Sequence, residues 1–486
     1  MPLTPTSLAQ LLHGDLLSAE VLDAELPLGR VETDSRRISS GDLFWALKGP
    51  RYDGHDYVAS AIAQSASAIV VEERWLRQAW QTRHFPERRV PTVVVANTLA
   101  AFGQYAAWHR RRHDLLAIGV TGSVGKTTTR HLIHTVLSTR YRGMQSPQNF
   151  NNHVGVPLSL LAIQPEDEFA VIECGASHVG EIRQLAELFG PEYGVITSIA
   201  PAHLDGFGNI EGVCRAKGEL FEALPPNGLA IVNGDDPLAR ALIKRANCRS
   251  ITVGEHLLNE VRATNVRCKN GSMEFEVDRS HFDLPVTGRS LLTSGLIALA
   301  MARELGLSDA EINEGFRQFQ PLAGRSCPIA LGKWTVIDDT YNASPASMQA
   351  ACATLSNWQP VGHGKRILIV GDMLSLGPKT DHYHQELGAT IANSGIDRLL
   401  AIGSQAATVA RTAKESGMDA GCLGACRDME TLEALLDCWL EPGDVILVKG
   451  SRAMQMEQVV EKLRNRDALE HQSTQTNERI PAYKAA

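Results

Sequence analysis

One segment constrains the fold of this chain more than any other: residues 115–129, which read LLAIGVTGSVGKTTT. The apolar run from Leu115 to Val120 predicts a buried strand, a glycine-containing loop follows, and a helix-like pattern continues to Ser138. In such a strand–loop–helix unit, the backbone N–H groups of the loop and the N-terminus of the helix face one point, which favours a bound phosphate. The segment therefore predicts a phosphate-binding loop at the end of a strand in an α/β fold.

The side chains of this loop favour a nucleotide triphosphate with its Mg²⁺ ion. Lys126 can reach the outer phosphates, and the hydroxyl of Thr127 can bind the metal. An ordinary glycine-rich turn is the alternative, but a Lys-Thr pair at a helix start has no packing purpose. The spacing is not the standard G-x-x-x-x-G-K-[ST], because Val120 occupies the position of the first glycine. The candidate nucleotide-binding residues of this shortened loop are Gly122, Ser123, Gly125, Lys126, Thr127 and Thr128.

Composition excludes several classes of protein. The chain has 486 residues, 44% of them hydrophobic and 21% charged, which is typical of a globular protein of about three domains. A net charge of -8 argues against a general nucleic-acid surface. No apolar run has the length of a membrane span, so we expect no membrane insertion. The nine cysteines contain no C-x-x-C motif, which favours a reduced, cytoplasmic setting.

Alternating strand-like and helix-like segments divide the chain into three α/β blocks. We expect an N-terminal domain at 1–112, a central domain with a mostly parallel sheet at 113–321, and a C-terminal Rossmann-like domain at 322–466. The polar tail at 467–486 is predicted to be disordered. The expected strands are Asp42–Leu47, Ala68–Val71, Thr92–Ala96, Phe169–Glu173, Tyr193–Ile199, Leu229–Asn233, Trp334–Asp338, Arg366–Val370, Arg398–Ile402 and Val445–Val448.

Polar residues follow several strands of the central block, where α/β proteins form their ligand crevice. Glu173 ends the strand FAVIE and can bind Mg²⁺ directly or through water, although a capping or solvated glutamate is the alternative. His203, in the loop after the next strand, would face the same crevice. Lys217 lies in a predicted helix over 212–224, where its local sequence favours a solvated side chain.

Two further loops allow either a ligand or a plain turn. The amides of Asn149, Asn151 and Asn152 suit hydrogen bonds to a sugar or a phosphate, or an elaborate turn. The segment DDTYNASP, from Asp338 to Pro345, suits ribose and phosphate contacts, or a turn closed by proline. The local sequence does not separate these readings.

Together, these motifs resemble the Mur ligase family, the ATP-dependent amide-forming enzymes of peptidoglycan precursor synthesis. The resemblance runs from about residue 30 to residue 465, and its last two strings are the most specific to the branch that adds D-alanyl-D-alanine. Its motifs are DSR at 34–36, TGSVGKTTT, NFNNHVGVPLSLL, ECGASHVGEI, IAPAHLDGFG, AKGELF, GDML, DDTYNASPASM and VILVKGSRAMQME.

The resemblance implies a reaction and its small-molecule partners. The carboxylate of UDP-N-acetylmuramoyl-tripeptide would attack the γ-phosphate of ATP, and the amine of D-Ala-D-Ala would then attack the acyl phosphate. In such a reaction, the negative charge of the carboxylate and the triphosphate has to be neutralised. The resemblance implies that Lys126, Arg325 and two Mg²⁺ ions do this. The family likeness also implies an enzyme that is a cytoplasmic monomer.

The same resemblance assigns roles to individual residues. Thr127 and Glu173 would bind the metal of ATP, and His203 with a carbamylated Lys217 would bind the second ion. Arg325, Asp339, Tyr341 and Asn342 would contact ATP, with Asp339 on the ribose. Ser35, Arg36, Asn151 and Asn152 would bind the UDP-sugar.

Three departures from the family pattern concern the handling of ATP. Val124 replaces the usual asparagine of the loop, Ser375 replaces a glutamate, and 288–294 reads GRSLLTS in place of G-x-H-N-x-x-N. We therefore expect adenine recognition to be altered or rebuilt with serine and threonine. The alternatives for function are the third-residue-adding ligase, a folylpolyglutamate synthetase-like protein, a non-catalytic nucleotide-binding homologue and a signalling-type NTPase.

Overall fold

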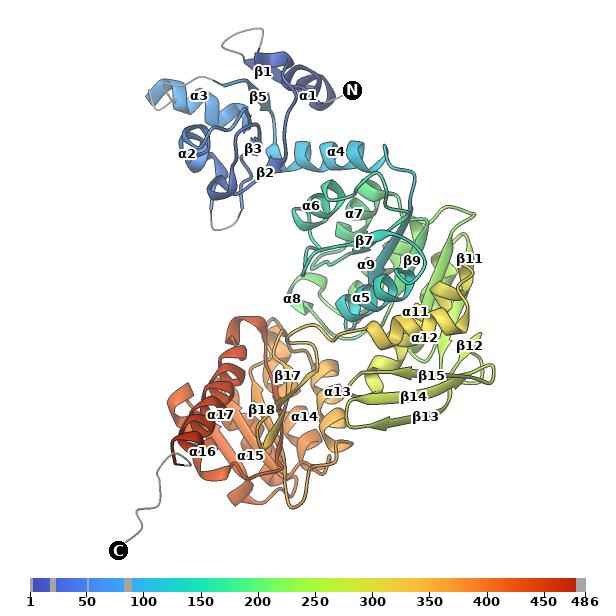
Figure 1. Cartoon of the computed structure of the whole chain (residues 1–486), viewed down its shortest axis with the longest axis vertical. Helices are drawn as coiled ribbons and strands as arrows, with labels where there is room; N and C mark the ends of the chain where they lie inside the picture. Colours follow the sequence, from blue (N-terminus) through green and yellow to red (C-terminus); the bar gives the residue numbers. More distant parts are fainter. Residues whose placement is uncertain (1–2, 18–22, 50–51, 83–89, 478–486) are drawn as a thin grey trace, which may run out of the picture. The chain divides into compact units, whose positions relative to one another are not determined.

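The computed structural model describes residues 3–17, 23–49, 52–82 and 90–477. The chain divides into two compact units (Figure 1). The first comprises Met1–Leu115, Ser146–Asp167 and Glu187–Phe189, and the second comprises Leu116–Gln145, Glu168–Ala186 and Gly190–Ala486. None of the helices in the described ranges combines the length and apolar character needed to cross a bilayer.

The first unit contains a sheet ordered β1-β5-β4-β3-β2, in which β2 to β5 are parallel and β1 is antiparallel to β5. The rings of Trp45 and Phe102 lie 5.2 Å apart and anchor its core. Leu158 and Leu161 of α6 pack against the same core. The elements are α1 (Pro5–Leu12), β1 (Asp15–Leu17), β2 (Val31–Glu32), β3 (Leu43–Trp45), α2 (Val58–Ala63), β4 (Ala68–Glu72), α3 (Glu73–Thr82), β5 (Thr92–Val95), α4 (Thr98–Arg110) and α6 (Gly155–Leu161).

The second unit begins with a parallel sheet ordered β12-β11-β10-β9-β6-β8-β7. Strand β6 lies between β8 and β9, so the loops that follow these three strands meet at one edge of the sheet. Its elements are β6 (Leu116–Thr121), α5 (Lys126–Leu137), β7 (Gly143–Gln145), β8 (Phe169–Glu173), α7 (Glu181–Phe189), β9 (Tyr193–Ile196), α8 (Leu204–Phe207), α9 (Ile210–Glu222), β10 (Leu229–Asn233), α10 (Pro237–Ala241), β11 (Arg249–Gly254) and β12 (Val261–Arg262).

A small antiparallel sheet, which the sequence did not predict, follows this parallel sheet. It is ordered β13-β14-β15, with β13 at Thr264–Lys269, β14 at Ser272–Val277 and β15 at Ser280–Leu284. Helices α11 (Leu292–Glu304) and α12 (Asp309–Gln318) come next in the chain (Figure 1). The rings of Phe275, Phe282 and Phe316 join this sheet to α12. The apolar face of this sheet is thus completed only by residues distant in sequence.

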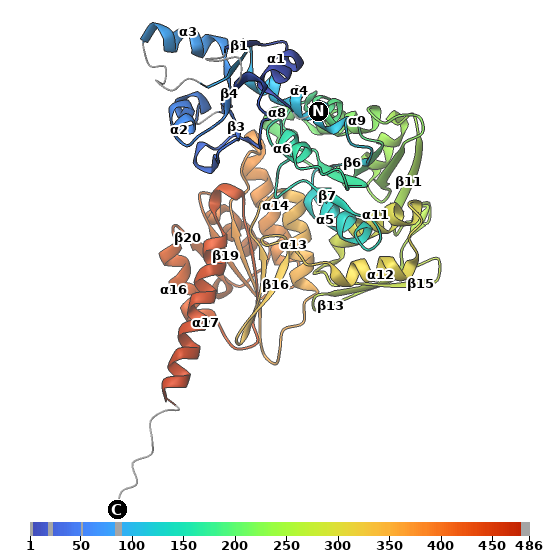
Figure 2. The same cartoon turned by 45° about the horizontal axis from the view of Figure 1, so that its top comes forward.

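The C-terminal block is a second open α/β sheet, as predicted. Its order is β16-β17-β21-β18-β19-β20, and all neighbours are parallel except β16 and β17. Helices α13, α14 and α15 cover one face, while α16 and α17 pack side by side on the other (Figures 1 and 2). The elements are β16 (Cys327–Leu331), β17 (Trp334–Asp339), α13 (Pro345–Ser356), β18 (Arg366–Gly371), α14 (Thr380–Ala392), β19 (Arg398–Ile402), α15 (Ala406–Glu415), β20 (Leu423–Cys426), α16 (Met429–Trp439), β21 (Val445–Lys449) and α17 (Glu457–Asn477).

The prediction of a disordered tail from residue 467 was wrong for its first part, because α17 continues as a helix to Asn477. Helix formers such as Leu, Glu, Gln and Ala fill this stretch, and the helix is anchored by Val459, Val460 and Leu463 in the sheet core. The rest of the predicted tail, 478–486, lies outside the described residues.

Candidate active site

The loop between β6 and α5 is shaped by two glycines with positive φ. Gly122 has φ +149° and Gly125, which caps α5, has φ +88°. A Cβ at Gly122 would lie 2.0 Å from Oγ1 of Thr197, so no other residue fits there without movement. The amine of Lys126 donates to the carbonyl oxygen of Gly122 at 2.7 Å and therefore lies across the loop.

Residues 197–200, which follow β9, brace this loop. Thr197 Oγ1 donates to the carbonyl of Val124 at 2.6 Å, and the N–H of Val124 donates to Ser198 Oγ at 3.0 Å. Ser123 Oγ donates to the carbonyl of Ala200 at 2.8 Å and accepts from its N–H at 2.9 Å. The loop is therefore held in a fixed conformation, as an oriented array of amides for phosphate requires. Val124 takes part in this bracing through its backbone alone.

Glu173 ends β8 in a strongly basic environment. Its side chain is 1% exposed, and Oε2 lies 3.7 Å from Nη1 of Arg130, which is 3% exposed. Glu173 also interacts electrostatically with Lys126 and Arg325, and burial lowers the pKa of each of these three cations. Three cations, of which Arg130 is buried and Lys126 and Arg325 are partly buried, surround one buried carboxylate and leave an excess of positive charge at the end of β6 and β8. Such a site attracts polyanions.

Arg130 is the residue of this cluster that the sequence did not identify. It follows Lys126 by four positions and Thr127 by three on α5, so all three lie on one side of the helix. The spacing of four positions from Lys126 was the sequence signal that could have identified Arg130 as a site residue. A basic residue one turn into a helix is usually solvated, and only the fold reveals its burial.

Lys217 is buried, contrary to the solvated position that its local sequence favoured. It is 3% exposed on α9, with its amine 5.6 Å from the ring of Phe207. The helix packs its inner face on the sheet, so Lys217 lies beneath the loops that follow β6 and β8. Burial, together with the positive charge of Lys126, lowers the pKa of Lys217 to about 7. A large fraction of this amine is therefore neutral at pH 7.

His203 lies beside these lysines, in the loop before α8. Its backbone is left-handed, with φ +51°, and the residue is exposed. Partial desolvation and the charges of Lys126 and Lys217 lower the pKa of His203, which keeps the imidazole neutral. A neutral imidazole is the form that binds metals. The structure thus brings together Lys126, Glu173, His203, Lys217 and Arg325, all within the second unit.

The segment DDTYNASP follows β17 and forms a hydrogen-bonded loop beside Arg325. The guanidinium of Arg325 lies 3.6 Å from the ring centroid of Tyr341, which fixes its direction. Asp339 accepts a hydrogen bond from Lys449 at 2.7 Å, while Asn342 is exposed. Tyr341 and Asp339 therefore lie in the surroundings of Arg325. Their contact with ATP stays a prediction.

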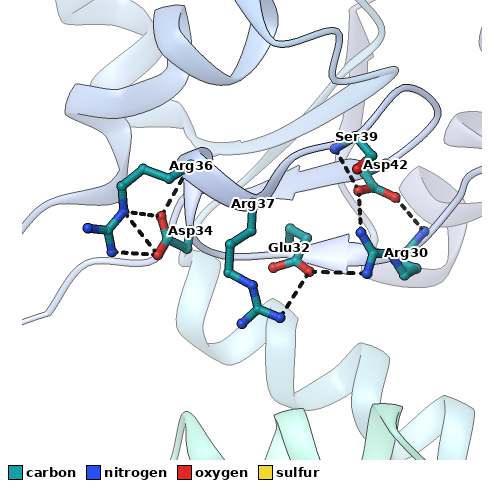
Figure 3. A network of polar contacts seen from close by, with 7 residues as sticks. All are labelled: Arg30, Glu32, Asp34, Arg36, Arg37, Ser39 and Asp42. Atoms are coloured by element: carbon teal, nitrogen blue, oxygen red, sulfur yellow. Dashed lines mark hydrogen bonds and ion pairs between the residues drawn. The ribbon is translucent and has the colours of Figure 1, made fainter.

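The predicted UDP-sugar residues Ser35, Arg36, Asn151 and Asn152 all belong to the first unit. Ser35 is buried, and the guanidinium of Arg36 binds both carboxylate oxygens of Asp34, which lowers the pKa of Asp34 to about 2 (Figure 3). Asn152 Oδ1 accepts from the N–H groups of Val154 and Gly155, at 3.1 and 2.9 Å. The side-chain oxygen of Asn152 therefore closes the turn that leads into α6, which supports the interpretation of this segment as a turn for that residue. The sugar-binding role of these four residues stays a prediction.

Figure 3 also shows a second polar network beside Arg36. Glu32 lies between the guanidinium groups of Arg30 and Arg37, with Nη–Oε distances of 3.9 Å in both cases. Asp42 accepts from Arg30 and from the N–H of Ser39. These contacts hold the loop 30–42 in shape, although exposed ion pairs of this kind contribute little stability.

The segment expected to contact adenine has a structural role at one position. Ser294 is 3% exposed, and its Oγ hydrogen-bonds Thr129 Oγ1 of α5 at 2.8 Å. Arg289 forms an ion pair with Glu255. The hydroxyl of Ser294 therefore joins α11 to the helix of the phosphate loop. Of the serine and threonine residues expected to recognise adenine, Ser290 and Thr293 remain candidates.

Comparison with known proteins identifies the class to which this fold and site belong. Three family models match in order along the chain: the Mur ligase family catalytic domain at 28–110, the Mur ligase middle domain at 120–302 and the Mur ligase glutamate ligase domain at 324–452. The chain belongs to the Mur ligase family.

Two full-length relatives that are more than 30% identical to this chain share one name. The UDP-N-acetylmuramoyl-tripeptide–D-alanyl-D-alanine ligase of Escherichia coli is 34% identical, over 92% of this chain and 96% of its own. The protein of that name from Bacillus subtilis is 32% identical, over 95% and 98%. A crystal structure of MurF from Acinetobacter baumannii superposes with a TM-score of 0.83 at 32% identity, covering 96% of this chain and 99% of its own. MurF from Thermotoga maritima in complex with ADP gives 0.75 at 26% identity, over 91% and 98%.

Proposed function

We propose that this protein joins D-alanyl-D-alanine to UDP-N-acetylmuramoyl-tripeptide with ATP, releasing ADP and phosphate, in the synthesis of peptidoglycan precursors. The observation that carries this proposal is the cluster of Lys126, Arg130 and Arg325 around Glu173 at the ends of β6 and β8. The names of the full-length relatives select the substrates. We also propose that the protein is a cytoplasmic monomer. Sedimentation analysis of the purified protein tests its oligomeric state.

The site suits a reaction between two anions. A substrate carboxylate oxygen attacks the γ-phosphorus of ATP, the bond to the β-phosphate oxygen breaks, and ADP leaves. The amine nitrogen of the dipeptide then attacks the acyl carbon, and phosphate leaves from the tetrahedral intermediate. Lys126 and Arg325 would offset the charge on the transferring phosphoryl group. The N–H groups at the start of α5, which follow the braced loop, would hold the β-phosphate.

The donor atoms of the site fit Mg²⁺. Thr127 offers a hydroxyl at the start of α5, which follows β6, and Glu173 offers a carboxylate oxygen at the end of the neighbouring strand β8. Phosphate oxygens usually complete such a site. The ion would neutralise phosphate charge in the reaction. Among the described residues, no three His, Cys, Asp or Glu side chains gather into a metal site. A second ion therefore needs a further carboxylate beside His203.

Carbamylated Lys217 would supply that carboxylate. The amine is buried on α9 and interacts electrostatically with His203, so a carbamate formed on it would lie near His203. The reaction joins the neutral amine nitrogen to the carbon of CO₂ and releases one proton. Because the amine is neutral in large part at pH 7, the reaction needs no further base to activate it.

A panel of amine acceptors tests the proposed function. The purified protein is supplied with ATP, Mg²⁺ and UDP-N-acetylmuramoyl-tripeptide, and ADP release is measured with D-Ala-D-Ala, with single amino acids and with no acceptor. Release that depends on D-Ala-D-Ala is expected. A requirement for a third-residue amino acid with the UDP-muramoyl-dipeptide would indicate the neighbouring ligase instead. Nucleotide binding without turnover would indicate a non-catalytic homologue.

A further inference from the structure

The turn that carries Arg325 is held on both sides by two consecutive carboxylates at the end of β17. The N–H of Gly324 donates to Asp338 Oδ2 at 3.0 Å, and the N–H of Ser326 donates to Asp339 Oδ1 at 3.1 Å. Both flanking residues have left-handed backbones, with φ +73° at Gly324 and +54° at Ser326. A serine in this conformation is unfavourable by itself, so its hydrogen bond to Asp339 stabilises a strained turn.

Lys449 binds the second of these carboxylates from the neighbouring strand. Its amine donates to Asp339 Oδ2 at 2.7 Å and to the carbonyl of Asn342 at 2.8 Å. The two side chains are 4% and 14% exposed, and Lys449 is the register partner of Asp339 in the parallel pair β17–β21. One ammonium group thus holds both Asp339 and the loop that contains Tyr341.

Both elements that orient the guanidinium of Arg325 therefore depend on Lys449. Asp339 fixes the turn on one side of Arg325, and the loop up to Asn342 presents the ring of Tyr341 at 3.6 Å. Removal of the ammonium leaves a largely buried carboxylate without its charge partner, which favours rearrangement of that carboxylate. A displacement of about 1 Å at a group that contacts the reacting atoms can cost about 100-fold in rate.

We propose that Lys449 is a positioning residue, which acts through Asp339 and the 340–342 loop to aim Arg325 at the phosphates of the nucleotide. The assignment rests on the proposed function. It also gives Asp339 a role in addition to the ribose contact that the family resemblance implied, since both of its oxygens accept hydrogen bonds within the protein.

A double-mutant cycle tests this role. Lys449→Met, Arg325→Ala and the double variant are compared for kcat of ADP release and for affinity toward a non-hydrolysable ATP analogue. If Lys449 acts through Arg325, Lys449→Met lowers kcat about 10- to 100-fold alone, but less than about threefold in the Arg325→Ala background. The KM for D-Ala-D-Ala is measured alongside, so that an effect on kcat is separated from an effect on acceptor binding.

Lys365→Met is the matched control. Lys365 pairs with Glu441 at 3.4 Å just before β18, so it lies at the opposite end of the parallel strands from Lys449. Its loss is expected to leave kcat and analogue affinity unchanged. If Lys449→Met does not fold, as judged by its thermal transition, Lys449→Gln carries the same cycle, because glutamine keeps a donor but removes the charge.

The outcomes separate this inference from the proposed function. Multiplicative effects of the two substitutions on kcat and on analogue affinity would overturn the positioning role, as would wild-type values for Lys449→Met. An inactive wild-type protein with D-Ala-D-Ala would instead refute the proposed function. The analogue-binding cycle would still decide whether Lys449 acts through Arg325.

Discussion

Gly122 offers the sharpest test of the phosphate loop, because one added methyl group meets a defined obstacle. In Gly122→Ala the Cβ would lie 2.0 Å from Thr197 Oγ1 and 3.1 Å from the N–H nitrogen of Ser198. Thr197 Oγ1 is the group that donates to the carbonyl of Val124 at 2.6 Å. The methyl group therefore forces apart the loop and its brace.

The magnitude follows from the geometry. Ordinary carbon–oxygen contact begins near 3.4 Å, so Thr197 and the loop have to separate by about 1.4 Å. The left-handed backbone of Ala costs about 1–2 kcal/mol, and the lost hydrogen bond about 1 kcal/mol more. We expect a destabilisation of about 2–3 kcal/mol together with a loss of about 100-fold in kcat/KM for ATP, since the amides that face the phosphates are displaced.

Gly417→Ala separates the steric effect from backbone strain. Gly417 has φ +105°, and nothing lies within 4 Å of an added Cβ. This control is expected to lose about 1–2 kcal/mol of stability and to keep its kcat/KM for ATP within about twofold. ADP-release kinetics and thermal unfolding are measured on both variants. Equal kcat/KM values for Gly122→Ala and Gly417→Ala would refute the argument that the loop geometry holds the phosphates.

Four further predictions concern the buried groups around this loop. Lys217→Ala is expected to lose nearly all ligase activity and to regain part of it with added short carboxylic acids; unchanged activity would refute its metal-binding role. Burial lowers the pKa of Lys217 to about 7, so the amine gains its proton as the pH falls through that value. Wild-type activity should therefore fall below about pH 7 and level off above it. A flat pH profile would contradict carbamylation. Ser294→Ala should lower the free energy of unfolding by about 1–3 kcal/mol, since Thr129 loses its buried partner, and leave the KM for ATP within about twofold; a large rise in KM would show that Ser294 binds adenine. Arg130→Met removes a buried charge partner of Glu173 and should cost about 3 kcal/mol, with Arg130→Lys less affected; thermal unfolding equal to wild type in both variants would contradict the pairing.

The sequence predicted the elements whose signals are local. Phe169–Glu173, Leu229–Asn233 and Arg398–Ile402 are strands with the predicted bounds, because short apolar runs buried on both faces are read without knowledge of their neighbours. The strand–loop–helix unit at Lys126 was equally clear. The hairpin strands β13 to β15 were not predicted, because one face of β13 is solvent-exposed and the apolar side of the sheet is completed at β14 and β15 by α12, far along the chain.

The amino-acid sequence alone thus determined the family, the three α/β blocks and the types of residue at the ends of the strands. The motifs span most of the chain, and each glycine, lysine or carboxylate in them has a local reason to be there. The tertiary structure decided which of these groups meet. It buried Lys217 against its local preference, added Arg130 to the site, assigned Ser294 and Asn152 to structural hydrogen bonds, and joined Lys449 to Asp339 across two strands. Burial and pairing depend on what the sheet brings together from distant segments, and the charge and pKa of each group follow from that environment.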